Sequence, residues 1–350
     1  MYSGYETLVK ELAERLVKSG NEVTVYCHRK LFNKKPKKVN GVNLVYTPSV
    51  NSKVFSQLYN SFFSFVHVCF SRSDVVLVVN SANGPFGLLT KIFKKKTCIN
   101  VDGLEWLRPK WKGLGSYYFK AASKLAIIFF DEIITDSVEM KKVYLGKFRR
   151  NSTVIAYGPT MSKFGKMNVL KHYNLKKRDY YLVVGRLIPD NNLDLIIDGF
   201  LKSNSNKKIV IVGDVPYSDK YANEIKKYNS SNIIFTGYIK NQINLTTLYK
   251  SCFAYIHGHE FGGTNPTMIN ALYLNNQIIA LDTPFNNEML ENREKVLFKK
   301  SINSLSNCII YFEKNYIKIK KLNIDYKFPK KYNWDKISNQ YLELFNSIIN

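Results

Sequence analysis

Short stretches of strand character alternate with helical stretches along this chain of 350 residues, and the alternation constrains its fold more than any other feature. In the first half, the stretches of strand character are Glu22–Cys27, Val42–Tyr46, Val75–Val79, Thr97–Val101 and Val154–Ala156. Strands that alternate with helices in this way form parallel, doubly wound sheets. The pattern therefore predicts an α/β protein.

The alternation restarts after a connector that runs from Tyr157 to Arg178. The second series of strands is Tyr181–Val184, Ile209–Val212, Ile233–Phe235, Phe253–Ile256 and Ile278–Leu281. A chain of this length is also too long for one small core. We therefore predict two Rossmann-like domains, residues 1–158 and 159–330, and an amphipathic closing helix within residues 331–350. Ligands of such sheets bind at the carboxyl ends of the strands, which here means the cleft between the two halves.

The first domain begins inside the loop that should precede its first helix. A βα domain normally opens with a buried strand and a Gly-rich loop, and about 15 residues of such a unit are missing. The first strand would be central in the sheet, so its loss would leave backbone groups unpaired in the core. A misassigned start codon explains this better than a damaged gene. Residues 2–7 are expected to form the remaining loop, facing the cleft.

Composition limits the partners and the compartment. The chain has 52 Lys and Arg against 27 Asp and Glu, a formal charge of +25, which favours polyanions or an anionic membrane leaflet. Nothing resembles a helix-turn-helix, zinc-finger or RNP pattern, so no specific nucleic acid is predicted. Five scattered cysteines predict buried free thiols in a reducing cytoplasm. The longest apolar run, Phe62–Phe70, is too short to span a bilayer.

The stretch from Tyr255 to Tyr273 is the strongest candidate for a binding site. It begins as the end of an apolar strand, passes through a polar turn with paired glycines, and continues as a helix from Pro266. Asn265 or Thr264 suits the N-cap of that helix. Free backbone N–H groups and the positive end of the helix dipole would then meet at one point, which suits a phosphate group. An ordinary βα turn is the alternative.

Several motifs, in order along the chain, carry a resemblance to a known family. They are Tyr2–Thr7, Val101–Trp106, Asp131–Ser137, Gly185-Arg186, His257–Pro266 and Asp282–Asn286. In these the chain resembles glycosyltransferase family 4, which consists of retaining sugar-nucleotide enzymes of the GT-B fold. It is most similar to bacterial rhamnosyltransferase-like members that build capsule, O-antigen or exopolysaccharide.

The resemblance implies a hexosyltransferase that moves L-rhamnose from dTDP-rhamnose onto a lipid-linked saccharide, with retention of anomeric configuration. Another donor such as UDP-glucose is the alternative within the same class. A degenerate, non-catalytic remnant or a basic binding protein is the alternative of a different class. No cofactor is implied besides the nucleotide-sugar substrate. The implied location is the cytoplasm, with peripheral association with the inner membrane face as an option.

The resemblance also implies roles on the donor side. Arg186 would hold the diphosphate, because a guanidinium forms bidentate bonds to phosphate oxygens. The other donor-binding candidates are His257, His259, Gly262, Gly263, Thr264, Asn265 and Asn270. There is no Asp-x-Asp motif, so we expect Arg186 and the helix N-terminus to stabilise the leaving group without a metal ion.

Two positions depart from the pattern of the wider family. Asn270 stands where a glutamate usually holds the nucleotide ribose, and Asn191 stands where a lysine is usual. An amide still forms a hydrogen bond to a ribose hydroxyl, but without the strength that a charge adds. A thymidine donor offers only a 3′-hydroxyl, so the change at Asn270 would cost less with such a donor.

On the acceptor side, Asp102 or Glu105 could orient or deprotonate an acceptor hydroxyl, which makes them the catalytic candidates. Tyr2, Gly4, Glu6 and Trp106 are the other acceptor-side candidates. Trp106 and Trp111 could stack on a sugar, with packing in the core or a loop as the alternative. The aromatic helix 54–70 and the basic loop 29–38 could dock on an anionic leaflet, with a core helix and a solvated charge run as the alternative.

Overall fold

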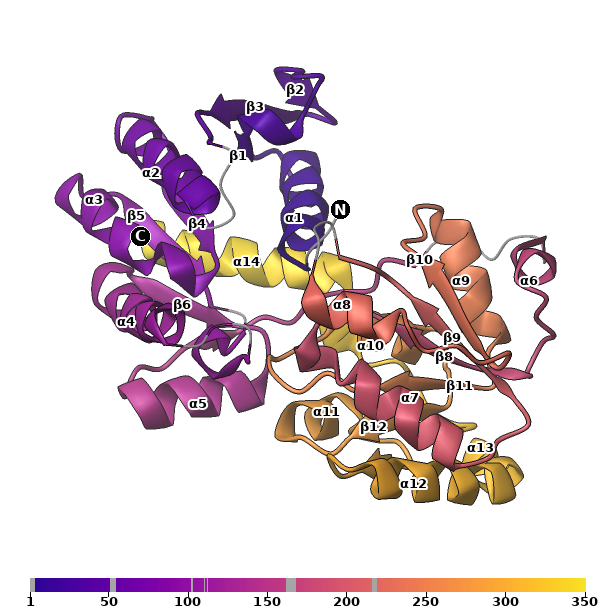
Figure 1. Ribbon diagram of the computed structural model, residues 1–350. Helices are drawn as coiled ribbons and strands as arrows, with labels where there is room; N and C mark the ends of the chain where they lie inside the picture. The colour runs from indigo at the N-terminus through magenta and orange to yellow at the C-terminus, as the bar shows by residue number, and fades with distance from the viewer. Residues whose placement is uncertain are drawn as a thin grey trace. The chain divides into compact units, whose positions relative to one another are not determined.

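The computed structural model describes residues 4–50, 55–101, 103–109, 111, 113–161, 168–215 and 219–350. The chain divides into two compact units (Figure 1). Unit 1 consists of Met1–Leu107, Trp111–Gly158 and Lys330–Asn350, and unit 2 of Arg108–Lys110 and Pro159–Pro329. Each unit is built of mostly parallel strands covered by helices, so the prediction of an α/β protein is confirmed.

The strands of unit 1 form two separate sheets. They are β1 (Thr24–His28), β2 (Lys38–Val39), β3 (Val42–Thr47), β4 (Val75–Val79), β5 (Lys96–Asn100), β6 (Glu132–Thr135) and β7 (Thr153–Val154). In the first sheet β3 pairs in parallel with β1 and antiparallel with β2. The second sheet is parallel, in the order β4-β5-β6-β7. No strand of the described residues therefore joins β1 to β4, and each is an edge strand.

Six helices and three of the four 3₁₀ helices in the described part of unit 1 surround these sheets. The helices are α1 (Gly4–Lys18), α2 (Phe55–Cys69), α3 (Gly87–Ile92), α4 (Leu114–Phe129), α5 (Val138–Phe148) and α14 (Trp334–Ile349). The 3₁₀ helices are η1 (Arg29–Leu31), η2 (Ser81–Phe86) and η3 (Glu105–Leu107). Helix α1 begins at Gly4, whereas a loop was expected through residue 7, so that expectation was wrong. Its buried residues Leu8, Leu12 and Leu16 lie on one face, as an amphipathic helix requires.

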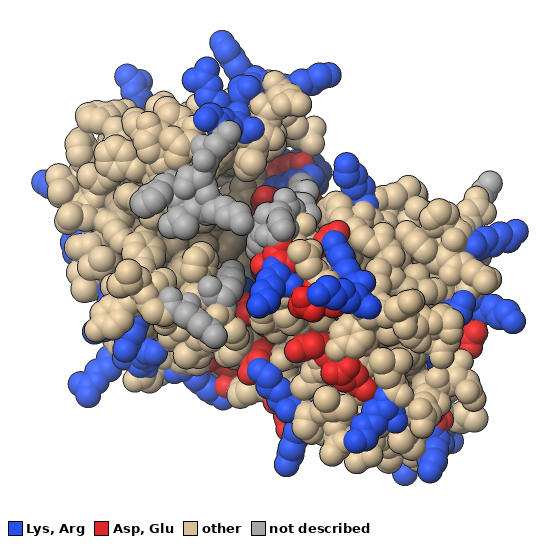
Figure 2. Space-filling model, in the orientation of Figure 1, with Lys and Arg blue, Asp and Glu red and all other residues tan. Residues whose placement is uncertain are grey.

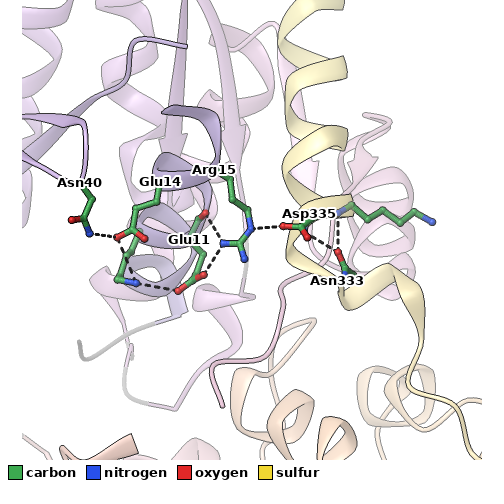
Figure 3. Close-up of polar contacts among 8 residues, drawn as sticks. Glu11, Glu14, Arg15, Asn40, Asn333 and Asp335 are labelled. Atoms are coloured by element: carbon green, nitrogen blue, oxygen red, sulfur yellow. Dashed lines mark hydrogen bonds and ion pairs between the residues drawn. The ribbon is translucent and has the colours of Figure 1, made fainter. Parts of the chain in front are cut away.

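The closing helix α14 joins unit 1 although it follows unit 2 in the sequence. It begins at the N-cap Asn333, whose side chain accepts hydrogen bonds from the backbone N–H groups of Asp335 and Lys336. It packs along α1, where Arg15 Nε lies 2.9 Å from Asp335 Oδ1 (Figure 3). On its buried face, Tyr341 Oη accepts a hydrogen bond of 3.0 Å from Asn100 at the end of β5.

Unit 2 is built on one continuous parallel sheet in the order β10-β9-β8-β11-β12-β13. Its strands are β8 (Tyr180–Val184), β9 (Lys208–Val212), β10 (Ile233–Gly237), β11 (Ala254–His257), β12 (Ile278–Leu281) and β13 (Val296–Phe298). The central strands are almost wholly apolar and buried, as expected when helices cover both faces of a sheet. The chain winds outward from β8 in one direction and from β11 in the other.

Eight α-helices belong to the described part of unit 2. They are α6 (Asn168–His172), α7 (Leu193–Lys202), α8 (Lys220–Ile225), α9 (Gln242–Ser251), α10 (Pro266–Tyr273), α11 (Pro284–Met289), α12 (Ile302–Lys314) and α13 (Tyr316–Leu322), with the 3₁₀ helices η4 (Pro189–Asn191) and η5 (Lys330–Tyr332), of which η5 belongs to unit 1. Helix α6 lies inside the expected connector 157–178. Strand β13 was also missed. Both elements are too short to show a clear hydrophobic period.

All five cysteines are free thiols: Cys69, Cys98 and Cys252 are buried, whereas Cys27 and Cys308 are half-buried. Burial raises the pKa of Cys252 to about 12, which keeps it protonated and unreactive. No helix of the described residues combines the length and the apolar character that crossing a bilayer requires.

Candidate functional site

The candidate site lies in unit 2, where β8 and β11 run side by side and end at the same edge of the sheet. Helix α7 leads from β8 to β9, and helix α10 leads from β11 to β12 on the other side. Because the winding reverses between these two strands, their carboxyl ends form a topological switch point, where ligands of such sheets bind. The loop after β8 spans residues 185–192, and the loop after β11 spans residues 258–265.

Three consecutive residues of the first loop hold three consecutive residues of the second. Asp190 O accepts from Glu260 N (3.1 Å), Asn191 Oδ1 lies 2.9 Å from His259 Nδ1, and Asn192 Nδ2 donates to Gly258 O (2.8 Å). We call residues 190–192 and 258–260 the clasp. It fixes the two loops relative to each other by direct hydrogen bonds.

Asn191 has a second role in the clasp because its Nδ2 donates to the backbone carbonyl of Arg186 at 2.7 Å. The amide nitrogen is thus directed at Arg186, and the amide oxygen is directed at the ring of His259. An amide oxygen can only accept, so His259 carries its proton on Nδ1. The contact is close: a Cβ atom at Gly185 would lie 2.9 Å from Asn191 Nδ2. A glycine at position 185 therefore lets the loop close over the amide.

The two histidines at the end of β11 and in the loop after it are neutral. His257 is buried, and its Nδ1 lies 3.0 Å from the hydroxyl of Tyr255. Burial lowers the pKa of His257 to about 3. Burial also lowers the pKa of His259 well below its usual value, and the charges of Arg108 and Arg186 and its neighbour His257 act in the same direction. At neutral pH both rings can donate or accept hydrogen bonds, but neither supplies positive charge.

The Gly-rich turn leads into α10 as the sequence predicts. Gly262 has a φ of +113°, a backbone conformation that residues with a side chain disfavour. Gly263 and Thr264 are buried, and Asn265 is the N-cap, with its side chain accepting from the backbone N–H of Thr267. Pro266 occupies the first helical position. The positive end of the α10 dipole therefore lies beside the clasp, where an anion would be stabilised.

Asn270 lies one turn into α10 and is buried, with 4% of its surface exposed. Its Oδ1 accepts a hydrogen bond of 2.8 Å from the backbone N–H of Thr160, and its Nδ2 lies 3.2 Å from the hydroxyl of the same residue. The side chain is thus engaged with the protein through both its oxygen and its nitrogen.

Arg186 is a half-buried cation in the loop after β8. A second guanidinium, that of the buried Arg108, lies with Nη1 3.6 Å from Oδ2 of Asp190 in the clasp. Lys300 is ion-paired with Glu260, next to the clasp. Among the described residues, no group of three or more His, Cys, Asp or Glu side chains is placed to hold a metal ion. The described part of the site therefore combines the guanidinium groups of Arg186 and Arg108, a helix N-terminus and two neutral imidazoles within a single unit.

The residues proposed for the acceptor side belong to unit 1, and the structure describes four of them, Gly4, Glu6, Glu105 and Trp106. The indole of Trp106 is buried against Tyr144 and Phe148, which is the core packing left open as the alternative. Glu105 accepts a hydrogen bond of 2.7 Å from Trp111 Nε1. Gly4 and Glu6 are in the first turn of α1. Tyr2 and Asp102 lie outside the described residues.

Two residues of the site were assigned no role from the sequence. Asn192 completes the clasp, and Asn286 in α11 donates to His259 O at 3.1 Å and to Leu281 O at 2.8 Å. Asn286 belongs to the motif Asp282–Asn286, so a signal was present. Its function as a brace for the loop after β11 depends on the packing of α11 against that loop, which the sequence does not reveal.

The two halves of the chain match two family models. Residues 169–327 match the model described as Glycosyl transferases group 1, and residues 1–160 match one described as Domain of unknown function (DUF1972). The chain is 28% identical over 217 residues to the uncharacterized glycosyltransferase MJ1059 of Methanocaldococcus jannaschii, covering 57% of this chain and 52% of that protein.

A second relative is the GtfA subunit of the UDP-N-acetylglucosamine–peptide N-acetylglucosaminyltransferase of Streptococcus agalactiae, 23% identical over 238 residues. That match covers 63% of this chain and 45% of the relative. The chain thus spans about half the length of the curated relatives it matches. Together the family model and the relatives support a glycosyltransferase.

Solved structures establish the fold class. Sucrose-phosphate synthase from Thermosynechococcus elongatus superimposes with a TM-score of 0.80 at 15% identity, covering 99% of this chain and 94% of that one. Anabaena Alr3699/HepE, solved in complex with UDP-glucose, gives a TM-score of 0.76 at 14% identity, with 99% and 98% covered. The chain has the GT-B fold of these proteins, with two Rossmann-like units.

Proposed function

We propose that the chain is a hexosyltransferase that moves a sugar from a nucleoside diphosphate to an acceptor hydroxyl. The observation that carries the proposal is the arrangement at the ends of β8 and β11: Arg186, the Gly262 turn and the N-terminus of α10 meet at one switch point. Each of these features favours a diphosphate, and they belong to two loops that the clasp holds together.

Charge develops on the leaving diphosphate as the glycosidic bond breaks, so catalysis requires positive potential at that point. The Arg186 guanidinium would form bidentate bonds to the phosphate oxygens. The backbone N–H groups before α10 and its dipole would add to this, and the neutral ring of His259 would donate or accept a hydrogen bond. We propose that transfer proceeds with retention and without a metal ion. Full turnover in excess EDTA is the expected result, and loss of turnover would contradict it.

For the donor we propose dTDP-L-rhamnose, as the family resemblance indicates. The state of Asn270 supports a deoxyribose nucleotide, because its amide is already engaged with Thr160 and offers no charged acceptor to a pair of ribose hydroxyls. A donor with a single ribose hydroxyl loses less at such a site. The alternative is a UDP-sugar, since Alr3699/HepE was solved with UDP-glucose and the GtfA relative is named for UDP-N-acetylglucosamine.

For the acceptor we propose a lipid-linked saccharide at the inner membrane face, within the synthesis of a bacterial capsule, O-antigen or exopolysaccharide. Glu105 and Asp102 are the proposed catalytic groups, and Tyr2, Gly4 and Glu6 the proposed acceptor-side residues. Glu105 is tied to Trp111, so it would orient an acceptor hydroxyl while the indole fixes the carboxylate.

The proposal is tested by measuring thermal unfolding with dTDP, UDP, GDP and ADP and with their sugar conjugates. A ligand at about 100 times its Kd adds about 2.7 kcal/mol, which shifts the Tm of a unit of this size by several degrees. We expect a shift selective for dTDP compounds, lost in Arg186→Ala and kept in the control Lys240→Ala, which removes an exposed cation of the same unit. A flat panel would contradict the proposal, and a UDP-selective shift would favour the alternative donor.

A further inference from the structure

A group of large apolar side chains is exposed on two helices of unit 1 that pack against each other. It consists of Tyr59, Phe62 and Phe70 of α2 and its end, and of Leu88, Ile92 and Phe93 of α3 and its end. Phe70 is 75% exposed and Ile92 is 65% exposed. The two helices pack against each other, and the rings of Phe70 and Phe93 meet edge to face at 5.1 Å. We call these six residues the aromatic face.

The aromatic face is not the core-facing side of α2. That side is occupied by Phe65, Val68 and Cys69, which are buried. Helix α2 therefore has large apolar side chains on opposite sides, and only one side is covered by the unit. Helices of globular proteins normally show polar residues on the outer side, and contiguous exposed apolar patches mark contact surfaces.

The charged residues around this face are almost all basic. Residues 23–101, which run from before β1 to the end of β5, carry twelve Lys and Arg side chains and a single acidic one, Asp74. Lys91, Lys94 and Lys96 are exposed beside Ile92 and Phe93. Figure 2 shows unit 1 over α2 and α3 as a largely uncharged surface with Lys and Arg side chains along its edge.

The basic loop 29–38 adjoins the same region. It holds six Lys and Arg residues with Leu31 and Phe32 between them, and Leu31 is exposed. It is anchored to the start of α2 through His28, whose Nε2 lies 2.6 Å from the hydroxyl of Ser56. Positive charge is thus present at both ends of α2, with exposed aromatic side chains between.

We propose that the aromatic face docks on an anionic lipid leaflet. Exposed aromatic rings partition into the headgroup region, where they bury apolar surface without having to cross the bilayer. The flanking lysines and the loop 29–38 would then contact lipid phosphates and anionic headgroups. An anionic leaflet explains six exposed apolar side chains flanked by lysines better than a nucleic acid or a soluble acidic protein does. The proposal deepens the proposed function, because a lipid-linked acceptor would be reached from such a surface.

The test is co-sedimentation of the full chain with vesicles, at low salt. One set contains phosphatidylcholine with 30% phosphatidylglycerol (about a bacterial inner-leaflet charge), and the other contains phosphatidylcholine alone. We expect binding to the anionic set, at least tenfold weaker binding to the neutral set, and weakening by added salt. Equal binding to both sets, or no binding to either, would overturn the proposal.

Two pairs of variants locate the surface. Phe70→Ser with Ile92→Ser should weaken binding at least tenfold, whereas Leu114→Ser, which removes an apolar residue that is 90% exposed on α4, should leave it within twofold. Lys91→Glu with Lys94→Glu should also weaken binding at least tenfold. Its control, Lys176→Glu with Lys177→Glu, makes the same change in net charge on exposed residues of unit 2. Variants that all behave like their controls would overturn the proposal.

Two further measurements separate this proposal from others. Hydrogen exchange of residues 59–93 should slow on anionic vesicles, and unchanged exchange would count against docking. Light scattering without lipid tests whether the face joins two copies of the chain; a dimer lost in the Phe70→Ser, Ile92→Ser variant would overturn lipid docking. The nucleotide-induced Tm shift should stay as in the wild type in every variant, so failure of vesicle binding and failure of the donor site are distinguishable.

Discussion

The two units share the alternation of strands and helices but differ in how their strands pair into sheets. In unit 2 six strands form one sheet, and its central strands β8 and β11 are buried almost throughout. In unit 1 the strands of the described residues form two sheets, and β4, although composed only of Val and Leu, is mostly half-buried. A wholly apolar parallel strand is normally covered on both sides.

This difference in strand pairing indicates which unit can hold a pre-organised binding site. The continuous sheet of unit 2 brings two loops together at a switch point, and the clasp locks them. In unit 1 the edges of β1 and β4 carry no strand partner among the described residues. We therefore expect unit 2 to be the rigid, donor-binding half and the edge strands of unit 1 to open locally at lower free energy.

The sharpest test of this comparison uses the same substitution in both units. Leu182→Ala in β8 removes a side chain that is fully buried, and we expect a loss of about 2–5 kcal/mol in the free energy of unfolding of unit 2. Leu77→Ala in β4 removes a half-buried side chain of an edge strand, and we expect a loss of about 1 kcal/mol. Urea unfolding followed by hydrogen exchange assigns each loss to its unit. Equal losses would show that β4 is as well covered as β8.

The second prediction concerns pH and unit 2 alone. Folded His257 has a pKa of about 3 against 6.5 when unfolded, so the unfolded chain binds a proton that the folded unit excludes. Its contribution to stability is fully present above pH 6.5 and is lost as the pH falls from 6.5 towards 3. At pH 5 the loss is about 2 kcal/mol.

The measurement for this prediction is the unfolding free energy of unit 2 at pH 7 and pH 5, for the wild type and for His257→Gln. The difference between the two pH values should be smaller by about 2 kcal/mol in the variant, because glutamine does not titrate. A variant that loses as much stability as the wild type would show that other groups cause the acid sensitivity.

A third prediction breaks the clasp that distinguishes unit 2. Asn191→Leu removes the hydrogen bonds to His259 and Arg186, which should cost about 1–2 kcal/mol of stability. Nucleotide binding should weaken as well, since the Arg186 loop loses its tie to the loop after β11. The control Asn223→Leu changes an exposed residue of α8 and should do neither. Isothermal calorimetry with the preferred nucleotide checks the effect, and equal affinity in both variants would contradict a positioning role.

The sequence predicted most strands of both units because their apolar runs are clear, and β4 and β12 were placed to the residue, but β2 and β6 were not among the predicted strands. It also predicted the Gly-rich turn, the Asn265 cap and the start of α10, since these depend on local chemistry. The start of α1 was wrong, and α6 and β13 were missed. The hydrogen bonds from Asn191 and Asn192 to the loop after β11 and from Asn286 to His259 could not be predicted. They join residues 27 to 68 positions apart, which lie close only once the sheet has formed.

The smallest expected effect concerns the ion pair between α1 and α14 in unit 1. Helix α14 comes from the end of the chain and packs on α1. Arg15 bridges Glu11 at 2.7 Å and Asp335 at 2.9 Å (Figure 3), but the Asp335 side chain is largely exposed, so solvent screens the pair. A double-mutant cycle of Arg15→Gln and Asp335→Asn should give a coupling of about 0.2–1 kcal/mol, reduced by salt. Coupling well above this would mean that the ion pair, rather than the apolar face of α14 with Ile337 and Tyr341, holds the helix on unit 1. We expect the apolar face to dominate, so Ile337→Ala should destabilise unit 1 by several times the coupling energy.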